Sequence, residues 1–413
     1  MHLSGVLVVL WSYSYIPVER EKERMAKITP AIETAARIKV IGIGGSGKNA
    51  LNHMIENKVR SVEFIAMNTD VQDLHNSLAD KKIHLGKNLT KGLGAGMNPE
   101  VGARAAEETK SEIQDAVKGA DMVFIACGMG GGTGTGGASV VARASKEQGI
   151  LTVAVVTKPF FFEGNQRMRI AEQGIAELEK EVDAIIVIPN DRLLAIAGKD
   201  TTFKDAFAKC DEVLRQAVEG ISELIASPGI INVDFADMKS VLTDAGTALM
   251  GVGFASGDGR AEKAAIQAIN SPLLDISING AKGVLFAISS NDDLTMAEFQ
   301  DAAKVITESI DKDARVIIGT ILDERIKKGE IKITVIATGF PSESMKKGAL
   351  FNPNSRELFN RQDQARERVA EEEKPMVQKP EKPSDADLAD TDVIDEDLDN
   401  FGAIPAFLRR NKK

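Results

Sequence analysis

The sequence is poor in cysteine, histidine and aromatic residues. Its 413 residues include two Cys, four His and one Trp, and aromatic residues make up 5%. Two cysteines at apolar positions, Cys127 and Cys210, exclude a disulfide framework and fit a reducing cytoplasm. Neither cysteine has the spacing of a metal ligand, so no metal site is expected. Because aromatic residues are scarce, aliphatic residues must form most of the core.

Long apolar runs and a basic excess are also lacking. The apolar stretch at 3–11 is shorter than the roughly 20 residues of a membrane span, so we expect residues 1–36 to be an N-terminal extension and no direct membrane span. The net charge is −10, and twelve acidic residues against three lysines lie between Glu371 and Asp399. The remainder is nearly neutral, and the absence of a basic patch argues against a nucleic-acid partner.

Alternating strand and helix patterns predict an α/β fold in the first half of the chain. Near-continuous apolar strands predict a parallel sheet covered on both faces, over residues 37–201. The expected strands are 37–43, 61–67, 122–127, 151–157 and 184–188, and the clearest helices are 46–57 and 107–117. Residues 91–102, with four glycines and a proline, are expected to form a loop.

The second half begins with apolar residues at helical spacing, which predict a long central helix at 202–229. A smaller α/β domain is expected at 230–341. Its predicted helices are 235–250, 260–269 and 295–310, and its predicted strands are 284–288, 316–321 and 331–337. The polar, acidic and proline-containing stretch 342–397 predicts a disordered linker, and the apolar and basic residues in 398–413 predict a partner-binding tail.

The densest glycine motif lies between an expected strand and an expected helix. Residues Gly128 to Gly137 read GMGGGTGTGG, after the strand at 122–127 and before a helix-like stretch at 138–148. Such a turn presents backbone N–H groups and the positive end of a helix dipole, which together bind phosphate. The motif therefore predicts an anion-binding loop.

A second glycine loop, Gly42–Asn49, follows the first strand and allows two interpretations. As G-x-G-x-x-G it matches a dinucleotide-binding fingerprint, with Asp70 available for the ribose. As a P-loop it has Asn49 where a hydroxyl residue should bind magnesium. Because both glycine loops follow parallel strands, they can also hold the phosphates of one nucleotide between them.

Five further motifs accompany these loops: Asn68–Asp70, Gly92–Gly96, Lys158–Gly164 with Arg167, Phe207–Leu214 and Asn232–Asp237. In this combination the chain resembles the FtsZ family of tubulin homologues, over about residues 35–340 and again at 403–410. The resemblance implies a GTP-hydrolysing cytoskeletal protein that polymerises head to tail into the filaments of the division ring, in the cytoplasm at mid-cell.

The resemblance also implies a role for each site residue. The residues expected to hold the nucleotide are Gly45, Ser46, Gly47, Lys48, Asn49, Asn68, Gly131, Gly132, Thr133, Gly134, Thr135, Gly136, Glu163, Arg167 and Asp211. Among them Glu163 and Arg167 would contact the ribose and Asp211 would read guanine. Mg2+ would be held mainly by the phosphates of GTP. Lys48 departs from the uncharged residue usual in the family, and its cation is expected to help hold the phosphates.

The catalytic residues would be Asn232, Asp234 and Asp237, in a loop that enters the nucleotide pocket of the next subunit. Taken without the resemblance, these two carboxylates are typical of a helix N-cap and first turn. The tail residues Ile404, Phe407, Leu408 and Arg409 would bind membrane-tethering division proteins. Two alternatives stay open: a dinucleotide-dependent oxidoreductase, and a filament that binds nucleotide without hydrolysing it.

Overall fold

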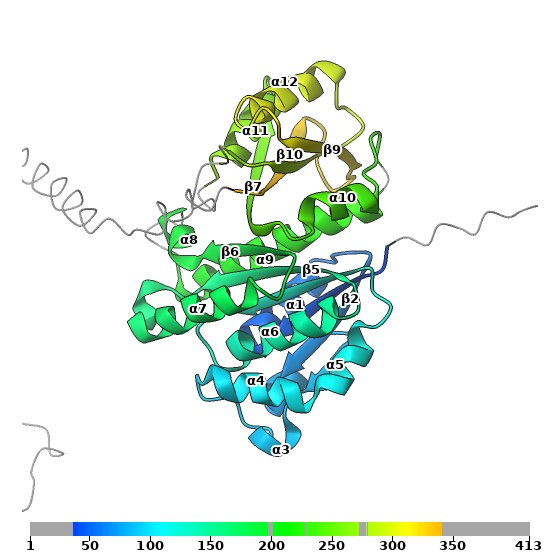
Figure 1. Ribbon diagram of the computed structural model, residues 1–413. Helices are drawn as coiled ribbons and strands as arrows, with labels where there is room; N and C mark the ends of the chain where they lie inside the picture. The colour runs from blue at the N-terminus through cyan, green and yellow to red at the C-terminus, as the bar shows by residue number, and fades with distance from the viewer. Residues whose placement is uncertain (1–35, 197–200, 228, 272–277, 279, 341–413) are drawn as a thin grey trace, which may run out of the picture. The chain divides into compact units, whose positions relative to one another are not determined.

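The computed structural model describes residues 36–196, 201–227, 229–271, 278 and 280–340 (Figure 1). Most of the expected N-terminal extension, the linker at 342–397 and the tail at 398–413 lie outside the described residues. Within the described part, strands and helices alternate through the first half of the chain.

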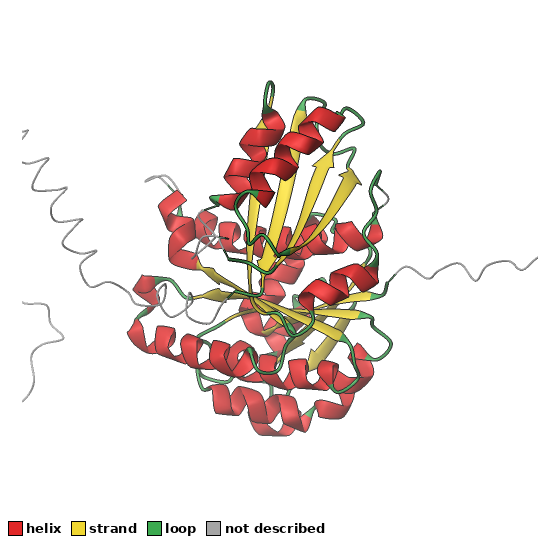
Figure 2. Ribbon diagram, turned by 45° about the horizontal axis from the view of Figure 1, so that its top comes forward, coloured by secondary structure: helices red, strands yellow, loops and turns green. Residues whose placement is uncertain are grey.

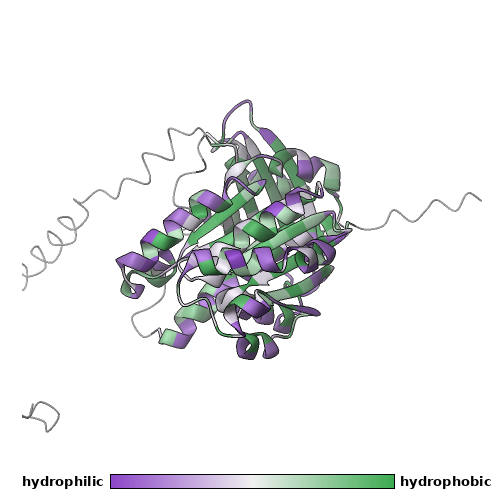
Figure 3. Ribbon diagram, turned by 60° about the horizontal axis from the view of Figure 1, so that its bottom comes forward, coloured by the Kyte–Doolittle hydropathy of each residue, from purple (hydrophilic) through white to green (hydrophobic). Residues whose placement is uncertain are grey.

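Six parallel strands form the first part of a sheet, in the order β3-β2-β1-β4-β5-β6. Their bounds are β1 Ile38–Ile43, β2 Val62–Asn68, β3 Lys81–His84, β4 Met122–Gly128, β5 Leu151–Lys158 and β6 Ala184–Pro189. The strands β1, β4 and β5 are almost entirely buried, as their apolar sequences predict (Figure 3). All six carboxyl ends consequently meet at one edge of the sheet.

Helices cover both faces of these strands (Figure 2). Val40 packs in one core with α1, whereas its neighbour Ile41 packs in another with α5 and α6, because successive strand residues point to opposite faces. The helices are α1 Gly44–Glu56, α2 Val71–His75, α3 Lys87–Thr90, α4 Pro99–Glu108, α5 Lys110–Val117, α6 Thr133–Lys146, η1 Phe161–Glu163, α7 Asn165–Leu178 and α8 Asn190–Ile196.

The long central helix is α9, Phe203–Ala226, close to its predicted span. The side chain of Thr202 caps it by accepting from the backbone N–H of Asp205. Its buried face includes Val213, Leu214, Ala217, Val218 and Ile221, the residues whose spacing predicted the helix.

The remaining strands continue the sheet in the order β7-β10-β8-β9, with β10 antiparallel to both neighbours. The elements are α10 Phe235–Leu242, β7 Gly246–Ser256, α11 Arg260–Ile269, β8 Gly283–Ser290, α12 Met296–Thr307, β9 Arg315–Leu322 and β10 Glu330–Thr338. Apolar residues of α11 and α12 form a separate core against these strands.

The predicted helix at 235–250 is wrong in its second half. Helix α10 ends at Leu242, and Asp244 and Gly246 follow with φ of 49° and 66°, which no helix continues through. Gly246 begins the eleven-residue strand β7, which pairs with β6 at Ala184–Ile186 and with β10 along its remaining length. Strand β7 thereby joins both strand groups into one ten-stranded sheet.

Other expected boundaries shift at the glycine loops. Helix α6 begins at Thr133 rather than 138, and α4 begins at Pro99, inside the expected loop 91–102. The expected helix 107–117 is divided at Thr109 into α4 and α5. Across the described ranges, no helix combines the length and apolarity needed to cross a membrane.

Candidate nucleotide-binding site

The two glycine loops lie side by side at the carboxyl edge of the sheet. Gly44, the first residue of α1, has φ of 73°, and a Cβ placed on it would come within 3.1 Å of the backbone nitrogen of Gly134. The strands that precede the loops, β1 and β4, are paired neighbours. The structure therefore brings both predicted phosphate loops into one place.

The residues that follow a third strand, β2, lie beside the two glycine loops. The hydroxyls of Thr69, after β2, and Thr133, at the start of α6, are 2.6 Å apart. The Asn68 amide donates to the carboxylate of Asp73 at 2.8 Å. Asp70 caps α2, because its Oδ1 accepts from the backbone N–H groups of Gln72 and Asp73.

The exposure of several loop residues suits the predicted binding of an anion. Gly45 and Ser46 are exposed in the first turn of α1, and no described atom lies within 4 Å of the Cβ position of Gly131. Conversely, a Cβ on Gly47 would approach the carbonyl oxygen of Ala126 to 2.5 Å. Two helix N-termini that converge on one open spot favour a phosphate chain.

Lys48 points into the protein and is 8% exposed. Its ammonium lies 2.7 Å from a carboxylate oxygen of Asp73. The expected extra cation is therefore present beside the loops but is neutralised by a partner. Sequence reasoning missed Asp73, whose only signal was an acidic residue in the first turn of a short helix.

The two predicted ribose residues lie against the second loop. Glu163 and Arg167 form an ion pair at 2.9 Å, and the Glu163 carboxylate also accepts from the backbone N–H of Phe160. A Cβ on Gly130 would lie 2.8 Å from Cγ of Arg167. This contact places the pair beside the glycine loop that follows β4.

Asp211 lies on α9, on the side that faces α1. Burial raises the pKa of its carboxyl to about 6, and the positive charges of His53 and Lys48 on α1 oppose that rise. A half-buried carboxylate with a raised pKa is often a functional group. Its position is consistent with the predicted contact to guanine.

The sequence analysis did not predict two further features near this edge of the sheet. Asn190 follows β6, is 5% exposed, and its Oδ1 has no hydrogen-bond partner among the described atoms. Its signal was a polar residue directly after a buried strand. Phe162, Phe203 and Phe207 form an exposed aromatic cluster, with ring centroids 5.0 Å apart for the pair on α9.

The predicted catalytic residues are not brought to the glycine loops. Asn232, Asp234 and Asp237 are all exposed, in the loop and first turn that follow α9. Asp234 caps α10, and Asn232 accepts from the backbone N–H of Gly229 at 2.7 Å. Asp211 lies in the first half of α9, so about 24 Å of helix separates it from this loop, at about 1.5 Å per residue.

No metal-binding group of three or more His, Cys, Asp or Glu residues occurs in the part of the chain that the structure describes. The donors at the loops are backbone N–H groups and hydroxyls, which suit phosphate oxygens rather than a cation. The prediction that Mg2+ arrives with the nucleotide and is held mainly by its phosphates stays a prediction.

Comparison with known proteins identifies the family. Residues 37–198 match the GTPase domain of the Tubulin/FtsZ family, and residues 246–341 match the C-terminal domain of the FtsZ family. An empty FtsZ dimer from M. jannaschii matches with 44% identity and a TM-score of 0.71, covering 75% of this chain and 89% of that chain. The chain belongs to the tubulin/FtsZ family.

A second FtsZ structure from M. jannaschii, of a mutant, matches equally well, covering 74% of this chain and 92% of that chain. CetZ1 from Haloferax volcanii, a GDP-bound monomer, shares the fold with 21% identity and a TM-score of 0.65, over 76% of this chain and 97% of that chain. CetZ2 from H. volcanii, a GTPγS-bound protofilament, also shares the fold, with 20% identity and a TM-score of 0.64. The match covers 82% of this chain and 100% of that chain.

Membership of the tubulin/FtsZ family makes this chain a cytoskeletal GTPase whose N-terminal domain binds GTP and GDP. The converging glycine loops are the part of the structure that fits the nucleotide's phosphates. The alternative of a dinucleotide-dependent oxidoreductase has no support from the family matches.

Proposed function

We propose that this protein hydrolyses GTP only where two copies meet head to tail, and that the resulting filaments build the division ring at mid-cell in the cytoplasm. The observation that carries the proposal is the separation of two parts of the site. The first glycine loop lies beside the first half of α9, where Lys48 acts on Asp211, whereas Asn232, Asp234 and Asp237 follow the C-terminal end of this helix.

The loop that carries these residues is held firmly although its side chains are exposed. Backbone Ile231 donates to the hydroxyl of Thr320 on β9 at 2.8 Å and accepts from the backbone N–H of Thr320 at 3.0 Å. Neither Asp234 nor Asp237 forms an ion pair with a described cation. Ile230 beside them is 83% exposed.

The chemistry that such a contact supplies is positioning and electrostatics. In phosphoryl transfer the protein orients the attacking water and stabilises the charge that develops on the phosphoryl oxygens. Asp234 and Asp237 would orient and polarise the water, Asn232 would help to position it, and the glycine loops would hold the phosphates. The bound Mg2+ would neutralise phosphate charge.

A head-to-tail contact also determines how the subunits assemble. A head-to-tail contact uses two different surfaces of the chain, and without a closing rotation it produces an open filament. Each added subunit then completes one GTP site and offers its own loops to the next.

A complementation experiment tests the shared site. Asp234→Ala lacks the water-orienting carboxylate, and Thr133→Val lacks a phosphate-loop hydroxyl. Each variant is expected to release little phosphate from GTP, whereas their mixture recovers part of the wild-type rate, because some contacts combine two intact halves. Asp301→Ala, at an exposed acid on α12, is the control and should keep full activity.

Two results would contradict this proposal. One is a wild-type rate per subunit that does not change with protein concentration. The other is a mixture no more active than its two components, provided that Asp234→Ala still binds GTP. If the wild type forms filaments with GTP but releases no phosphate, the non-hydrolysing filament is the correct function instead.

We further propose that the tail docks on a membrane-tethering division protein. Ile404, Phe407, Leu408 and Arg409 lie outside the described residues, so this proposal stands on the sequence and the resemblance alone. Deleting 403–413 should abolish recruitment to membranes that carry the tethering protein and leave GTP turnover unchanged. A collapse of filament formation in the truncated protein would show that the tail belongs to the filament contact.

A further inference from the structure

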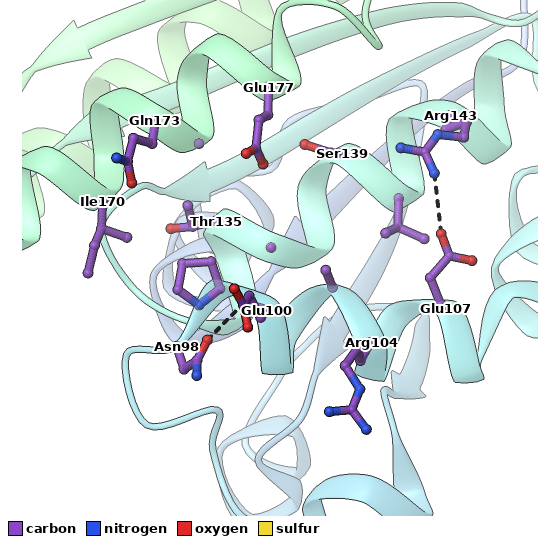
Figure 4. A pocket seen from close by; sticks show the side chains of 15 residues that line it. Asn98, Glu100, Arg104, Glu107, Thr135, Ser139, Arg143, Ile170, Gln173 and Glu177 are labelled. Atoms are coloured by element: carbon purple, nitrogen blue, oxygen red, sulfur yellow. Dashed lines mark hydrogen bonds and ion pairs between the residues drawn. The ribbon is translucent and has the colours of Figure 1, made fainter.

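Asp211 differs from two other unpaired acids of the GTPase domain. Glu100 and Glu177 border a cavity of about 440 Å³ among α4, α6 and α7, where both carboxylates are exposed to water and need no protein partner (Figure 4). Asp211 is half-buried, and its carboxylate forms no hydrogen bond or ion pair with any described atom. Burial without a partner costs free energy, so this carboxylate is available for a donor that arrives with a ligand.

The residue after Asp211 connects α9 with α1. The carboxylate of Glu212 lies 3.1 Å from Nε2 of His53, which is in the last turn of α1. Arg215 binds the same carboxylate through two nitrogen atoms, at 2.8 and 2.6 Å, and the amide of Gln216 donates to it at 2.8 Å. His53 thus adds a bond from another helix to a carboxylate that α9 already holds in place.

The ionisation of Glu212 determines which atom of this bond carries the hydrogen. Burial raises the pKa of this carboxyl, but hydrogen bonds from Arg215, His53 and Gln216 outweigh burial and hold the pKa at about 2. Glu212 is therefore ionised at neutral pH and can only accept, so Nε2 of His53 is the donor. On the other side of the ring, Nδ1 lies 3.4 Å from the amide nitrogen of Asn57, which is a donor. A neutral His53 with its hydrogen on Nε2 consequently keeps the link to α9.

Helix α1 connects the expected phosphate site with the expected base site. Residues 45–49 belong to the first glycine loop and lie at the start of this helix. His53 follows Asn49 by four residues, so one face of α1 extends from the loop to the contact with α9. Asp211 directly precedes Glu212 on α9, and the charge of His53 reaches it. The bond between His53 and Glu212 therefore fixes where the Asp211 carboxylate lies relative to the phosphate loop.

We propose that His53 is a positioning residue for guanine, because its bond to Glu212 holds the first half of α9 against α1 and so keeps the Asp211 carboxylate in place for the base. This inference rests on the predicted contact between Asp211 and guanine. A carboxylate accepts two hydrogen bonds from guanine only where both distances and both angles are suitable. Adenine presents no such pair of donors, so a displaced carboxylate weakens the binding of GTP and leaves the binding of ATP unchanged.

Displacement of a fluorescent GTP analogue from the full chain, by GTP and by ATP, tests the proposal. His53→Leu lacks the donor, while Glu212 keeps its bonds from Arg215 and Gln216, so the variant should remain folded. Its preference for GTP over ATP should fall about tenfold, the size of one charge-assisted hydrogen bond. His53→Gln, whose amide can donate to Glu212, should restore most of the preference. Glu56→Gln, at an exposed acid of the same helix, is the control and should change neither affinity.

Steady-state kinetics separate positioning from a general structural role. In GTP hydrolysis, His53→Leu should raise the KM for GTP and leave kcat unchanged, because the glycine loops and the acids after α9 are intact. Thermal unfolding of each variant verifies that it is folded. The displacement measurements do not require hydrolysis, so their outcome is independent of whether two copies share the GTP site.

Four results would overturn the inference. One is an unchanged preference for GTP in His53→Leu. Equal losses of GTP and ATP affinity in this variant would show that it disturbs the phosphate loop rather than the contact with the base. A His53→Gln variant as weak as His53→Leu would show that packing of the ring, and not the hydrogen bond, is what matters. An unchanged preference in Asp211→Asn would refute the guanine contact on which the inference rests.

Discussion

At the scale of single residues, the ion pair between Lys48 and Asp73 determines the charge beneath the phosphate loops. Lys48→Asn would leave the carboxylate of Asp73 unpaired next to the nucleotide's phosphates. We expect GTP affinity to fall about tenfold, or ~1.4 kcal/mol, and the magnesium requirement to rise, because the metal must then supply the missing positive charge. Fluorescent GTP titrations across magnesium concentrations measure both effects.

The matched control for this prediction is the double variant Lys48→Asn/Asp73→Asn. It removes both charges, so most of the lost affinity should return, and the double-mutant cycle should show strong coupling. If Lys48→Asn changes neither the GTP affinity nor the magnesium dependence, the pair has only a structural role.

Asp211 makes guanine recognition dependent on pH. Its pKa of about 6 leaves the carboxylate ionised at neutral pH and protonated as the pH falls through that value. Since only the ionised form accepts both hydrogen bonds from guanine, the preference for GTP over ATP should decline between pH 7 and pH 5. Asp211→Asn should show no such decline, because it lacks the titrating group.

The same carboxyl affects stability in the opposite direction. The folded pKa lies above the usual value of 3.8, so the nucleotide-free protein loses stability as the pH rises from about 4 to about 6, and the loss is complete above that range. Asp211→Asn should therefore keep or raise the unfolding temperature at pH 7 while it loses guanine preference. A lower unfolding temperature would indicate that the carboxylate has a stabilising partner.

At the scale of elements, the packing of α4 against α6 depends on glycine. A Cβ on Gly136 would overlap the backbone oxygen of Pro99, which cannot move without shifting α4. Gly136→Ala should therefore lower the free energy of unfolding by about 3 kcal/mol, as measured by urea denaturation.

Gly131→Ala in the preceding loop is the matched comparison. No described atom lies within 4 Å of its Cβ position, so stability should change by less than about 0.5 kcal/mol. Comparable losses from both substitutions would mean that backbone flexibility, rather than helix packing, explains the glycines.

At the scale of the whole molecule, charged residues connect α9 with the C-terminal strands. Arg325, after β9, donates to Asp323 at 2.8 Å, to Glu219 at 3.1 Å and to Glu223. Glu219 is 3% exposed and is also bound by Arg215. At the other end of this face, Glu212 bonds His53 of α1 at 3.1 Å. The central helix is thus bonded to α1 on one side and to the segment after β9 on the other, through buried or half-buried side chains.

Removing Arg325 should weaken this connection. Arg325→Met leaves Glu219 with one of its two cations, and a stability loss of about 1–2 kcal/mol is expected because Glu219 cannot reach water. Lys328→Met, in the same turn, removes an exposed pair with Asp292 and should change stability by less than about 0.5 kcal/mol. Equal effects in thermal unfolding would contradict a special role for Arg325.

Local patterns were sufficient to predict several parts of the molecule. Apolar spacing predicted α9, and glycines after apolar strands predicted both phosphate loops, because periodicity and turn chemistry are properties of short segments. The same motifs, taken together, identified the family. In each of these cases the residues that carry the signal are near neighbours in the chain.

Contacts between distant segments determined the rest. The first five residues of β7, 246–250, fall within the predicted helix 235–250, but their partners on β6 and β10 make them a strand. The burial of Lys48 depends on Asp73, 25 positions away, and the cavity exists only because α4, α6 and α7 pack together. The distance between the glycine loops and Asp234 likewise follows from the length and position of α9. These features cannot be predicted from short segments of sequence, because their free energy depends on contacts with residues far along the chain.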